Sequence, residues 1–259
     1  FKPDELISAN LSVRRRNGKG VIDRFRGRVM FPIIDLRGNV IAFGGRIMTD
    51  EKPKYLNSSD TPVFKKSENL FSLNNAKNSG SRALILCEGY MDVIALHGAG
   101  FENAVAGLGT ALTPEQVSLI SRYADEVALC YDSDEAGQNA ANKAMRILGE
   151  VGMDVRVLKM NGAKDPDEYI KKFGVEAFRR VLGESKSGFD YNLEKIASAY
   201  DLSLPEEKIK ASADVCAIIS GAYFGDKISL MSDTTVLASS TSEVPIFKHI
   251  KYLMITTTP

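Results

Sequence analysis

Four short apolar runs, separated by segments of helical pattern, constrain the fold of this chain more than any other feature. They cover residues 83–87, 104–106, 127–131 and 155–158, and helices are expected over about 90–99, from Pro114 and over about 136–149. Thr113 and Pro114 are typical of a helix start, because threonine caps the first turn and proline fits the first helical position. Strands that alternate with helices form a mostly parallel sheet covered by helices. The sequence therefore predicts an α/β fold.

The segments on either side of this alternation have a different character. Residues 29–35 and 40–46 are predicted to form a hairpin, and residues 50–62, rich in Pro, Lys and Ser, a loop. Residues 167–220 look largely helical, whereas residues 222–259 carry 11 Ser and Thr without clear periodicity. We expect a smaller basic mixed α+β lobe over 1–82, the parallel-sheet domain over 83–165, a helical part over 166–221 and an unassigned tail over 222–259.

Acidic residues follow three of the predicted strands. Glu88 follows the first run, Asp132-Ser133-Asp134 the third, and Asp165-Pro166-Asp167 comes shortly after the fourth. Because the carboxyl ends of parallel strands lie at one edge of a sheet, these carboxylates are expected to converge. Oxygen ligands without His or Cys suit Mg²⁺ or Mn²⁺ rather than zinc. The pattern predicts an enzyme that uses a divalent cation to act on phosphates.

Each acidic motif also has a purely structural interpretation. Glu88 is compatible with a surface residue at a strand end, although Gly89 permits a tight turn there and Asp92 lies one helical turn further on the same side. Asp134 or Ser133 is a possible helix cap. Asp165 followed by Pro166 is a complete helix start, so a capping role stays open beside a metal-binding one.

Basic residues gather in the first third of the chain. Residues 1–82 hold 16 Lys and Arg against 8 Asp and Glu, whereas the remainder holds 17 against 25. Arg24, Arg26 and Arg28 alternate, so in a strand they would share one face and offer guanidinium groups to phosphates. The alternative is an exposed edge strand whose charges prevent aggregation. The further basic-lobe candidates are Arg46, Lys52, Lys54, Tyr55, Lys65 and Lys66.

Other features narrow the class of protein. No apolar run approaches the roughly 18 residues needed to cross a bilayer, so no membrane partner is expected. The three cysteines are far apart, and Cys87 and Cys130 lie in strand-like runs, which favours buried free thiols and a reducing cytoplasm. His97 and His249 lack metal-ligand spacing. Since the chain starts at Phe1, we expect it to be part of a longer protein.

An ordered set of motifs resembles a known family. Its members here are residues 23–32, Phe43 to Arg46, Pro53 to Ser58, Glu88-Gly89-Tyr90-Met91-Asp92, Leu108 to Thr110 and Asp165-Pro166-Asp167. Together they resemble the catalytic core of bacterial DNA primases, the DnaG family, from about residue 1 to about residue 220. The region from Leu84 to about Leu158 is similar to the Toprim module, which type IA and type II topoisomerases and some nucleases share.

The resemblance implies a function and a set of site residues. The family makes short RNA primers on single-stranded DNA from ribonucleoside triphosphates, and is therefore a nucleotidyltransferase that uses Mg²⁺ or Mn²⁺; no zinc is expected in this chain. By position, the metal-binding acids would be Glu88, Asp92, Asp132, Asp134, Asp165 and Asp167, of which Glu88, Asp132 and Asp134 are the catalytic set. Template and nucleotide binding would fall to Arg24, Arg26, Arg28, Arg46, Lys54, Tyr55, Asn57 and Lys66.

The match to the family is incomplete. Ser133 stands where primases usually have glycine, and the zinc-binding domain, the first part of the polymerase core and the helicase-binding domain have no counterpart here. A replicative helicase is therefore expected only as a partner of a longer protein, at the nucleoid-associated replication fork in the bacterial cytoplasm. Two alternatives remain: a Toprim-type metal-dependent nuclease and an inactive single-stranded-DNA-binding fragment. A topoisomerase would need a cleavage tyrosine that we cannot assign.

Overall fold

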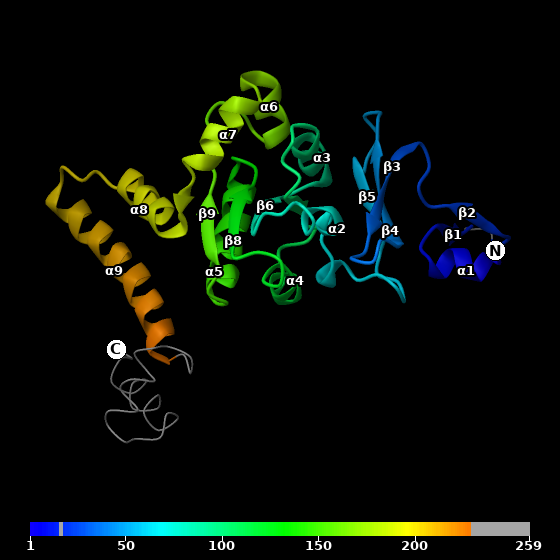
Figure 1. Ribbon diagram of the computed structural model, residues 1–259, viewed down its shortest axis with the longest axis horizontal. Helices are drawn as coiled ribbons and strands as arrows, with labels where there is room; N and C mark the ends of the chain where they lie inside the picture. Colours follow the sequence, from blue (N-terminus) through cyan, green and yellow to red (C-terminus); the bar gives the residue numbers. More distant parts are fainter. Residues whose placement is uncertain (16–17, 229–259) are drawn as a thin grey trace, which may run out of the picture. The chain divides into compact units, whose positions relative to one another are not determined.

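The computed structural model describes residues 1–15 and 18–228, with side chains up to Cys216 (Figure 1). It contains two compact units, Phe1–Gly188 and a second that begins at Phe189, and each is described by itself. The tail predicted over 222–259 lies outside the residues whose side chains are described. None of the helices in the described ranges is long and apolar enough to cross a membrane.

A five-stranded sheet forms the centre of the first unit. Its strands are β6 (Ala83–Cys87), β7 (Ala104–Ala106), β8 (Glu126–Cys130), β9 (Asp154–Val157) and β10 (Lys186–Ser187), in the order β10-β9-β8-β6-β7. The first four strands are parallel, and β10 is antiparallel to β9. This confirms the predicted α/β fold. The strand β10 was not predicted, because two residues carry no periodicity.

Helices cover both faces of this sheet, as Figure 1 shows. They are α3 (Tyr90–Gly98), α4 (Pro114–Ile120), α5 (Glu135–Gly149), α6 (Pro166–Phe173) and α7 (Val175–Gly183). Alternate residues of a strand point to opposite faces. Ile85 and Cys87 thus share one buried cluster with Val93 of α3 and Phe178 of α7. The predicted helices over 90–99 and 136–149 are confirmed, and so is the helix start at Thr113 and Pro114.

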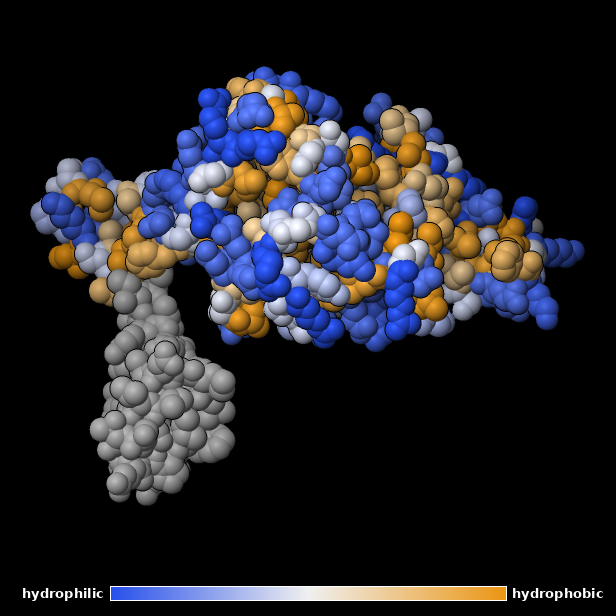
Figure 2. All heavy atoms as spheres, viewed as in Figure 1, coloured by the Kyte–Doolittle hydropathy of each residue, from blue (hydrophilic) through white to orange (hydrophobic). Residues whose placement is uncertain are grey.

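The basic N-terminal lobe contains two small antiparallel sheets. Helix α1 (Pro3–Ser8) precedes the pair β1 (Ser12–Arg14) and β2 (Val21–Asp23), and the second sheet has the order β3 (Arg28–Ile34), β4 (Val40–Ile47) and β5 (Tyr55–Asn57). The predicted hairpin is confirmed as β3 and β4. On the face seen in Figure 2, hydrophobic side chains reach the surface around these two strands. Exposed hydrophobic residues of this hairpin and its end include Val40, which is 53% exposed, and Met48, which is 69% exposed.

Two predictions for this lobe are wrong. Residues 50–62 are not all loop, since Tyr55 to Asn57 pair with Gly44 to Arg46 as β5. Arg24, Arg26 and Arg28 do not line one strand. Arg24 and Arg26 lie in the bend between β2 and β3, where Gly27 has a φ of +64°, and Arg28 begins β3. A residue in this left-handed region ends the extended conformation on which the alternation depended.

A short connection joins the lobe to the parallel sheet. It contains the 3-10 helix η1 (Lys66–Glu68) and α2 (Leu73–Ala76), and Phe64 packs with Ile33 and Leu108 in a small core. Gln116 of α4 is fully buried there, and its amide nitrogen donates to the carbonyl oxygens of Lys66 at 2.9 Å and Asn69 at 2.8 Å. These hydrogen bonds hold the Lys66–Asn69 segment against the sheet domain.

Replacing Gln116 with leucine is expected to destabilise the protein by about 1–3 kcal/mol, because the partly buried carbonyl oxygens of Lys66 and Asn69 lose their donor. Thermal and urea unfolding monitored by circular dichroism would measure this change. Exchange of the exposed Gln138 for leucine removes a similar amide at an exposed position and is the matched control. Equal stability of the Gln116 variant and wild type would contradict the role given to this side chain.

The second unit is helical where it is described, which agrees with the helical prediction for 167–220. It contains α8 (Gly188–Ala199), which starts at the last residue of the first unit, and α9 (Pro205–Ile228). The hydroxyl group of Tyr200, between these helices, donates to Asp214 of α9 at 2.7 Å.

Candidate active site

The predicted acidic residues follow strands whose register places their ends together. Cys87, the last residue of β6, pairs with Cys130, the last residue of β8, and Leu129 of β8 pairs with Val157 of β9. Glu88 and Asp132 therefore leave the sheet at the same edge. Direct contact confirms their proximity, because the Asp132 backbone N–H donates to Glu88 Oε1 at 2.9 Å.

The loop of Asp132, Ser133 and Asp134 is fixed at both ends. Asp134 caps α5 by accepting a hydrogen bond from the Gly137 N–H at 2.9 Å. Ser133 donates from its N–H to the Lys164 carbonyl at 3.1 Å, and its hydroxyl donates to the Ala163 carbonyl at 3.3 Å. Ser133 does not have a positive φ, so the backbone of this loop accepts a residue with a side chain at that position.

The Asp165 motif has the structure that a helix start requires. The Asp165 carboxylate accepts from the Glu168 N–H at 2.8 Å, and Pro166 occupies the first turn of α6. Asp167 pairs with Lys171 one turn later, at 2.6 Å. Capping is thus one role of Asp165, and it fixes the carboxylate near the loop of Asp132, since Lys164 contacts that loop.

Asp92, Asp132 and Glu88 have raised pKa values, because they are partly buried and lie close to other acidic residues of the site. Burial, together with the neighbouring charges of Asp165, Asp132 and Asp167, raises the pKa of Asp92 from 3.8 to about 7. Burial also raises the pKa of Asp132 and of Glu88. The carboxylates of Asp132 and Asp134 raise the pKa of Lys164, whose ammonium group lies 3.4 and 3.9 Å from their oxygens. Close carboxylates of this kind favour a bound cation.

The carboxylate oxygens of the predicted acids are suitable ligands for a hard divalent ion. Six carboxylates come from the loops after β6, β8 and β9 and the first turns of α3 and α6, without His or Cys, which suits Mg²⁺ or Mn²⁺. Among the residues that the structure describes, no three His, Cys, Asp or Glu side chains are already arranged to hold a metal ion. The metal-binding assignments of individual acids remain predictions.

Among the predicted basic-lobe residues, a group around Tyr55 lies near the acids. The Arg46 guanidinium and the Lys54 ammonium lie 5.7 and 5.8 Å from the Tyr55 ring centre. Burial raises the pKa of Tyr55, and the charges of Asp92, Asp165 and Asp132 contribute to that increase. Tyr55 is 42% exposed, so its ring is open to a ligand. We call the sheet edge that carries the six predicted metal-binding acids, from Glu88 to Asp167, the acidic edge, and Tyr55 lies beside it.

The other predicted binding residues differ in availability. Arg28 uses its guanidinium group on the carbonyl oxygens of Pro53, Lys54 and Gly45. Arg24 contacts the Ser59 hydroxyl at 3.4 Å, and Asn57 donates to the Leu108 carbonyl at 3.1 Å. Arg26 is exposed, and Gln116 holds the backbone of Lys66. Arg28 is therefore committed to connecting β4 with the Pro53–Lys54 backbone that precedes β5, whereas Arg26 is open to solvent.

Gly137 and Tyr90 shape the site and were among the residues that sequence reasoning missed. A methyl group on Gly137 would overlap the Asp132 carbonyl oxygen and lie 2.6 Å from Glu88 Oε1. Tyr90 is buried among Phe31, Tyr55 and Phe71, with ring centres 4.9 to 5.6 Å away. Both residues act through neighbours that are distant in sequence. Their only sequence signal was their position, in the first turn of a helix that follows an acidic motif.

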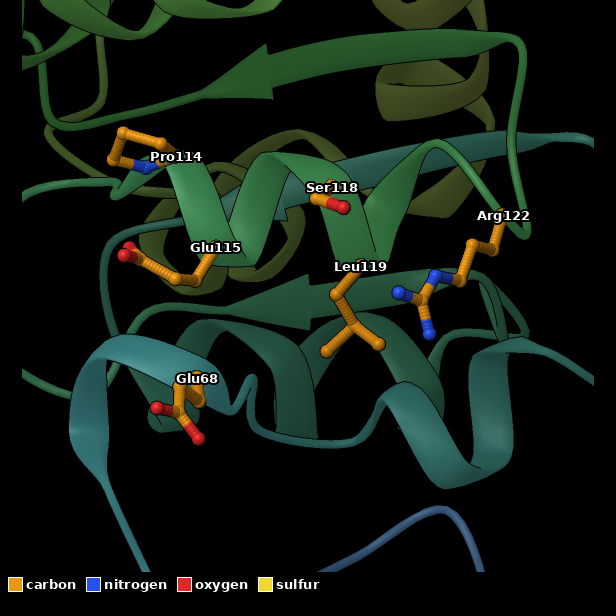
Figure 3. Close-up of a pocket in the computed structure, with 6 residues that line it drawn as sticks. All are labelled: Glu68, Pro114, Glu115, Ser118, Leu119 and Arg122. Carbon is orange, nitrogen blue, oxygen red and sulfur yellow. The ribbon is translucent and has the colours of Figure 1, made fainter.

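A surface pocket lies away from this edge. It has a volume of ≈ 510 Å³ and lies along α4 and η1, with Glu68, Glu115 and Arg122 among the residues that line it (Figure 3). None of the predicted site residues lines it. The candidate site is therefore defined by the acidic edge and the adjoining lobe.

Comparison with solved structures identifies the family. The Escherichia coli primase catalytic core superimposes with a TM-score of 0.73 and is 37% identical, over 84% of this chain and 71% of that core. The chain belongs to the bacterial DnaG-type DNA primase family. A DnaG primase catalytic domain bound to single-stranded DNA is also similar, with a TM-score of 0.72 and 38% identity over 82% of this chain and 69% of that domain.

Sequence comparisons agree with membership in the DnaG family. The family model "DNA primase catalytic core, N-terminal domain" matches residues 1–77, and the model "Toprim-like" matches residues 85–170. DNA primase of Clostridium acetobutylicum is 47% identical over 216 residues, which are 83% of this chain and 36% of that protein. DNA primase of Synechococcus elongatus is 43% identical over 76% of this chain and 29% of that protein.

Two further facts limit what membership in the DnaG family implies. The chain spans about a third of the length of the curated primases that it matches. A third family model, "Na+/H+ antiporter family", matches residues 221–259.

The buried Asp92 predicts a pH-dependent stability for the metal-free protein. The folded state keeps Asp92 protonated up to about pH 7, whereas the unfolded chain ionises it near 3.8. The stability that Asp92 contributes is complete below about pH 3.8 and is lost as the pH rises towards 7. Asp92→Asn should therefore stabilise the protein at pH 8 by up to about 4 kcal/mol and have little effect at pH 4. Unfolding in EDTA at both pH values tests this, and equal effects at both would contradict it.

Proposed function

We propose that this chain performs template-directed synthesis of RNA primers, transferring nucleotides from ribonucleoside triphosphates on single-stranded DNA. Membership in the DnaG family supports this function, and so does the similarity to a DnaG catalytic domain whose solved structure contains single-stranded DNA. The observation that carries the proposal is the acidic edge after β6, β8 and β9, beside the exposed ring of Tyr55 and the charge of Arg46. This arrangement offers a cation site next to groups that bind phosphates and bases.

The acids would divide the work of holding the metal. Asp132, Asp134, Asp92, Asp165 and Asp167 would hold Mg²⁺ or Mn²⁺, which when bound neutralises charge on the triphosphate and the leaving pyrophosphate. Glu88 has two possible roles. It would either complete the ligand set or accept the proton of the primer 3′-hydroxyl group, and burial, which raises its pKa, makes it a better proton acceptor than an exposed glutamate.

The N-terminal lobe would bind the template and the nucleotide. Arg46 and Lys54 would contact phosphates, and Tyr55 would stack on a base, which grips a single strand without reading its sequence. Asn57 and Lys66 would bind the nucleotide, and Arg24 and Arg26 would extend the basic surface. Arg28 would act indirectly, by holding β4 against the Pro53–Lys54 backbone.

Incorporation of labelled ribonucleotides on single-stranded DNA, with Mg²⁺ or Mn²⁺ and with EDTA, tests the proposal. We expect short RNA products that require the metal, and DNA binding that weakens steeply with salt. Cleavage of the DNA instead would indicate a Toprim-type nuclease. Binding without products, also after the chain is joined to the upstream part of a related primase, would indicate a single-stranded-DNA-binding protein.

The wider setting is also a proposal. The matched relatives are bacterial DNA primases, so we propose that the chain acts at a replication fork in the bacterial cytoplasm. A replicative helicase would be a partner of a longer protein that contains this chain. Co-purification of that longer protein with the helicase from the same genome would test the partnership.

A further inference from the structure

Lys164 is a basic residue within the acidic edge and had no role in the sequence prediction. Its ammonium group lies 3.4 Å from Asp132 Oδ2 and 3.9 Å from Asp134 Oδ2. Both carboxylates belong to the loop after β8, whereas Lys164 precedes α6 on the loop after β9. The lysine thus brings a positive charge to two of the acids that we assign to metal binding.

The backbone around Lys164 is held on both sides. Its N–H donates to the Glu168 carboxylate at 2.9 Å, and its carbonyl oxygen accepts from the Ser133 N–H at 3.1 Å. The side chain itself is 59% exposed, whereas that of Asp132 is only 21% exposed. The main chain therefore keeps the lysine beside the acids, while the exposed side chain is free to move at low cost, since exposed ion pairs are weak.

We infer that Lys164 is an internal counter-cation of Asp132 and Asp134. A divalent ion that binds these carboxylates displaces the Lys164 ammonium group, and this displacement lowers the affinity of the site for the ion. The inference rests on the proposed function, because it assumes a metal site at these carboxylates. Without metal, Lys164 reduces the repulsion between Asp132 and Asp134. With metal, the same ammonium group competes for the same oxygens, so its removal strengthens binding.

The test compares Lys164→Met with a matched lysine variant. Lys172 is exposed and its ammonium group donates to the Gly162 carbonyl at 2.9 Å, on the same loop. Lys172→Met therefore removes a nearby charge without removing a contact to Asp132 or Asp134. Lys164→Arg keeps the charge. Mn²⁺ binding is followed by electron paramagnetic resonance of the free ion, and unfolding is measured in EDTA, so neither readout depends on activity.

We expect Lys164→Met to bind Mn²⁺ about three- to tenfold more tightly than wild type, the scale of losing a weak ion pair. It should also unfold at a lower temperature in EDTA, while Lys172→Met and Lys164→Arg bind Mn²⁺ like wild type. Unchanged or weaker binding by Lys164→Met would overturn the inference, as would equal tightening in Lys172→Met. Absence of Mn²⁺ binding in wild type and in all variants would contradict the metal site itself, and with it the proposed function.

Discussion

Asp132→Asn is expected to reduce ribonucleotide incorporation by about 100- to 1,000-fold, the scale of losing one essential charge in an active site. Asp132 is the least exposed carboxylate of its loop and lies next to Glu88, Asp134 and Lys164. Asparagine has the same shape but no charge to hold a cation. Single-turnover incorporation at saturating ribonucleotide, with and without added Mn²⁺, measures the loss.

The folded state should tolerate this substitution. Burial raises the pKa of Asp132, so folding already opposes its charge, and the backbone N–H that binds Glu88 does not depend on the side chain. The free energy of unfolding should change by no more than about 1 kcal/mol, the contribution of the lost Lys164 pair. Asp154→Asn, at the opposite end of β9, removes an exposed carboxylate and is the control. Equal activity of Asp132→Asn and Asp154→Asn would argue against the proposed metal site.

Gly137→Ala should disrupt the acidic edge without removing any of its charges. The added Cβ atom would overlap the Asp132 carbonyl oxygen and approach Glu88 Oε1 to 2.6 Å, so the start of α5 and the loop after β8 must separate. Overpacking of this kind costs about 1–3 kcal/mol, and the higher helix propensity of alanine offsets at most about 1 kcal/mol. We expect a net loss of stability and a fall in incorporation of about 100-fold, since displacements of about 1 Å have effects of that size.

Gly149→Ala in the same helix is the matched control, because nothing lies within 4 Å of a Cβ atom at that position. Alanine there should stabilise the protein by up to about 1 kcal/mol and leave incorporation unchanged. Unfolding curves and primer synthesis by both variants, measured side by side, separate the clash from the change in helix propensity. Full activity of Gly137→Ala would show that the loop and α5 can part without consequence.

Local patterns predicted the sheet well and the N-terminal lobe poorly. The strand β6 is a continuous apolar run and β8 is one after its first residue, Glu126, and their burial follows from that composition. The strand β5 is only three residues long, and its pairing with β4 rather than its composition creates it. The arginine alternation from 24 to 28 resembles a strand, but the turn at Gly27 prevents one. Periodicity identifies elements that bury a face, whereas short strands and bends depend on partners elsewhere in the chain.

The same distinction applies to the candidate site. The edge was predictable for Glu88 and Asp132 because parallel strands end together, and the cap at Asp165 because its sequence pattern is local. Lys164 and Gly137 act through residues about 30 and 49 positions away, respectively, at Asp132 and Glu88. Contacts at that separation leave no trace in spacing. The individual roles of the acids and of the basic lobe remain predictions that the variants above test.

Two of the three thiols are buried and the third is exposed, so a thiol reagent should label the chain at one position. Cys87 and Cys130 are buried at the ends of β6 and β8, and burial raises the pKa of Cys87 well above its usual value, whereas Cys216 of α9 is exposed. A maleimide dye should therefore react with Cys216 and spare the native fold around the acids. One fluorophore attached in this way would report on the second unit during template binding, without any cysteine having to be removed.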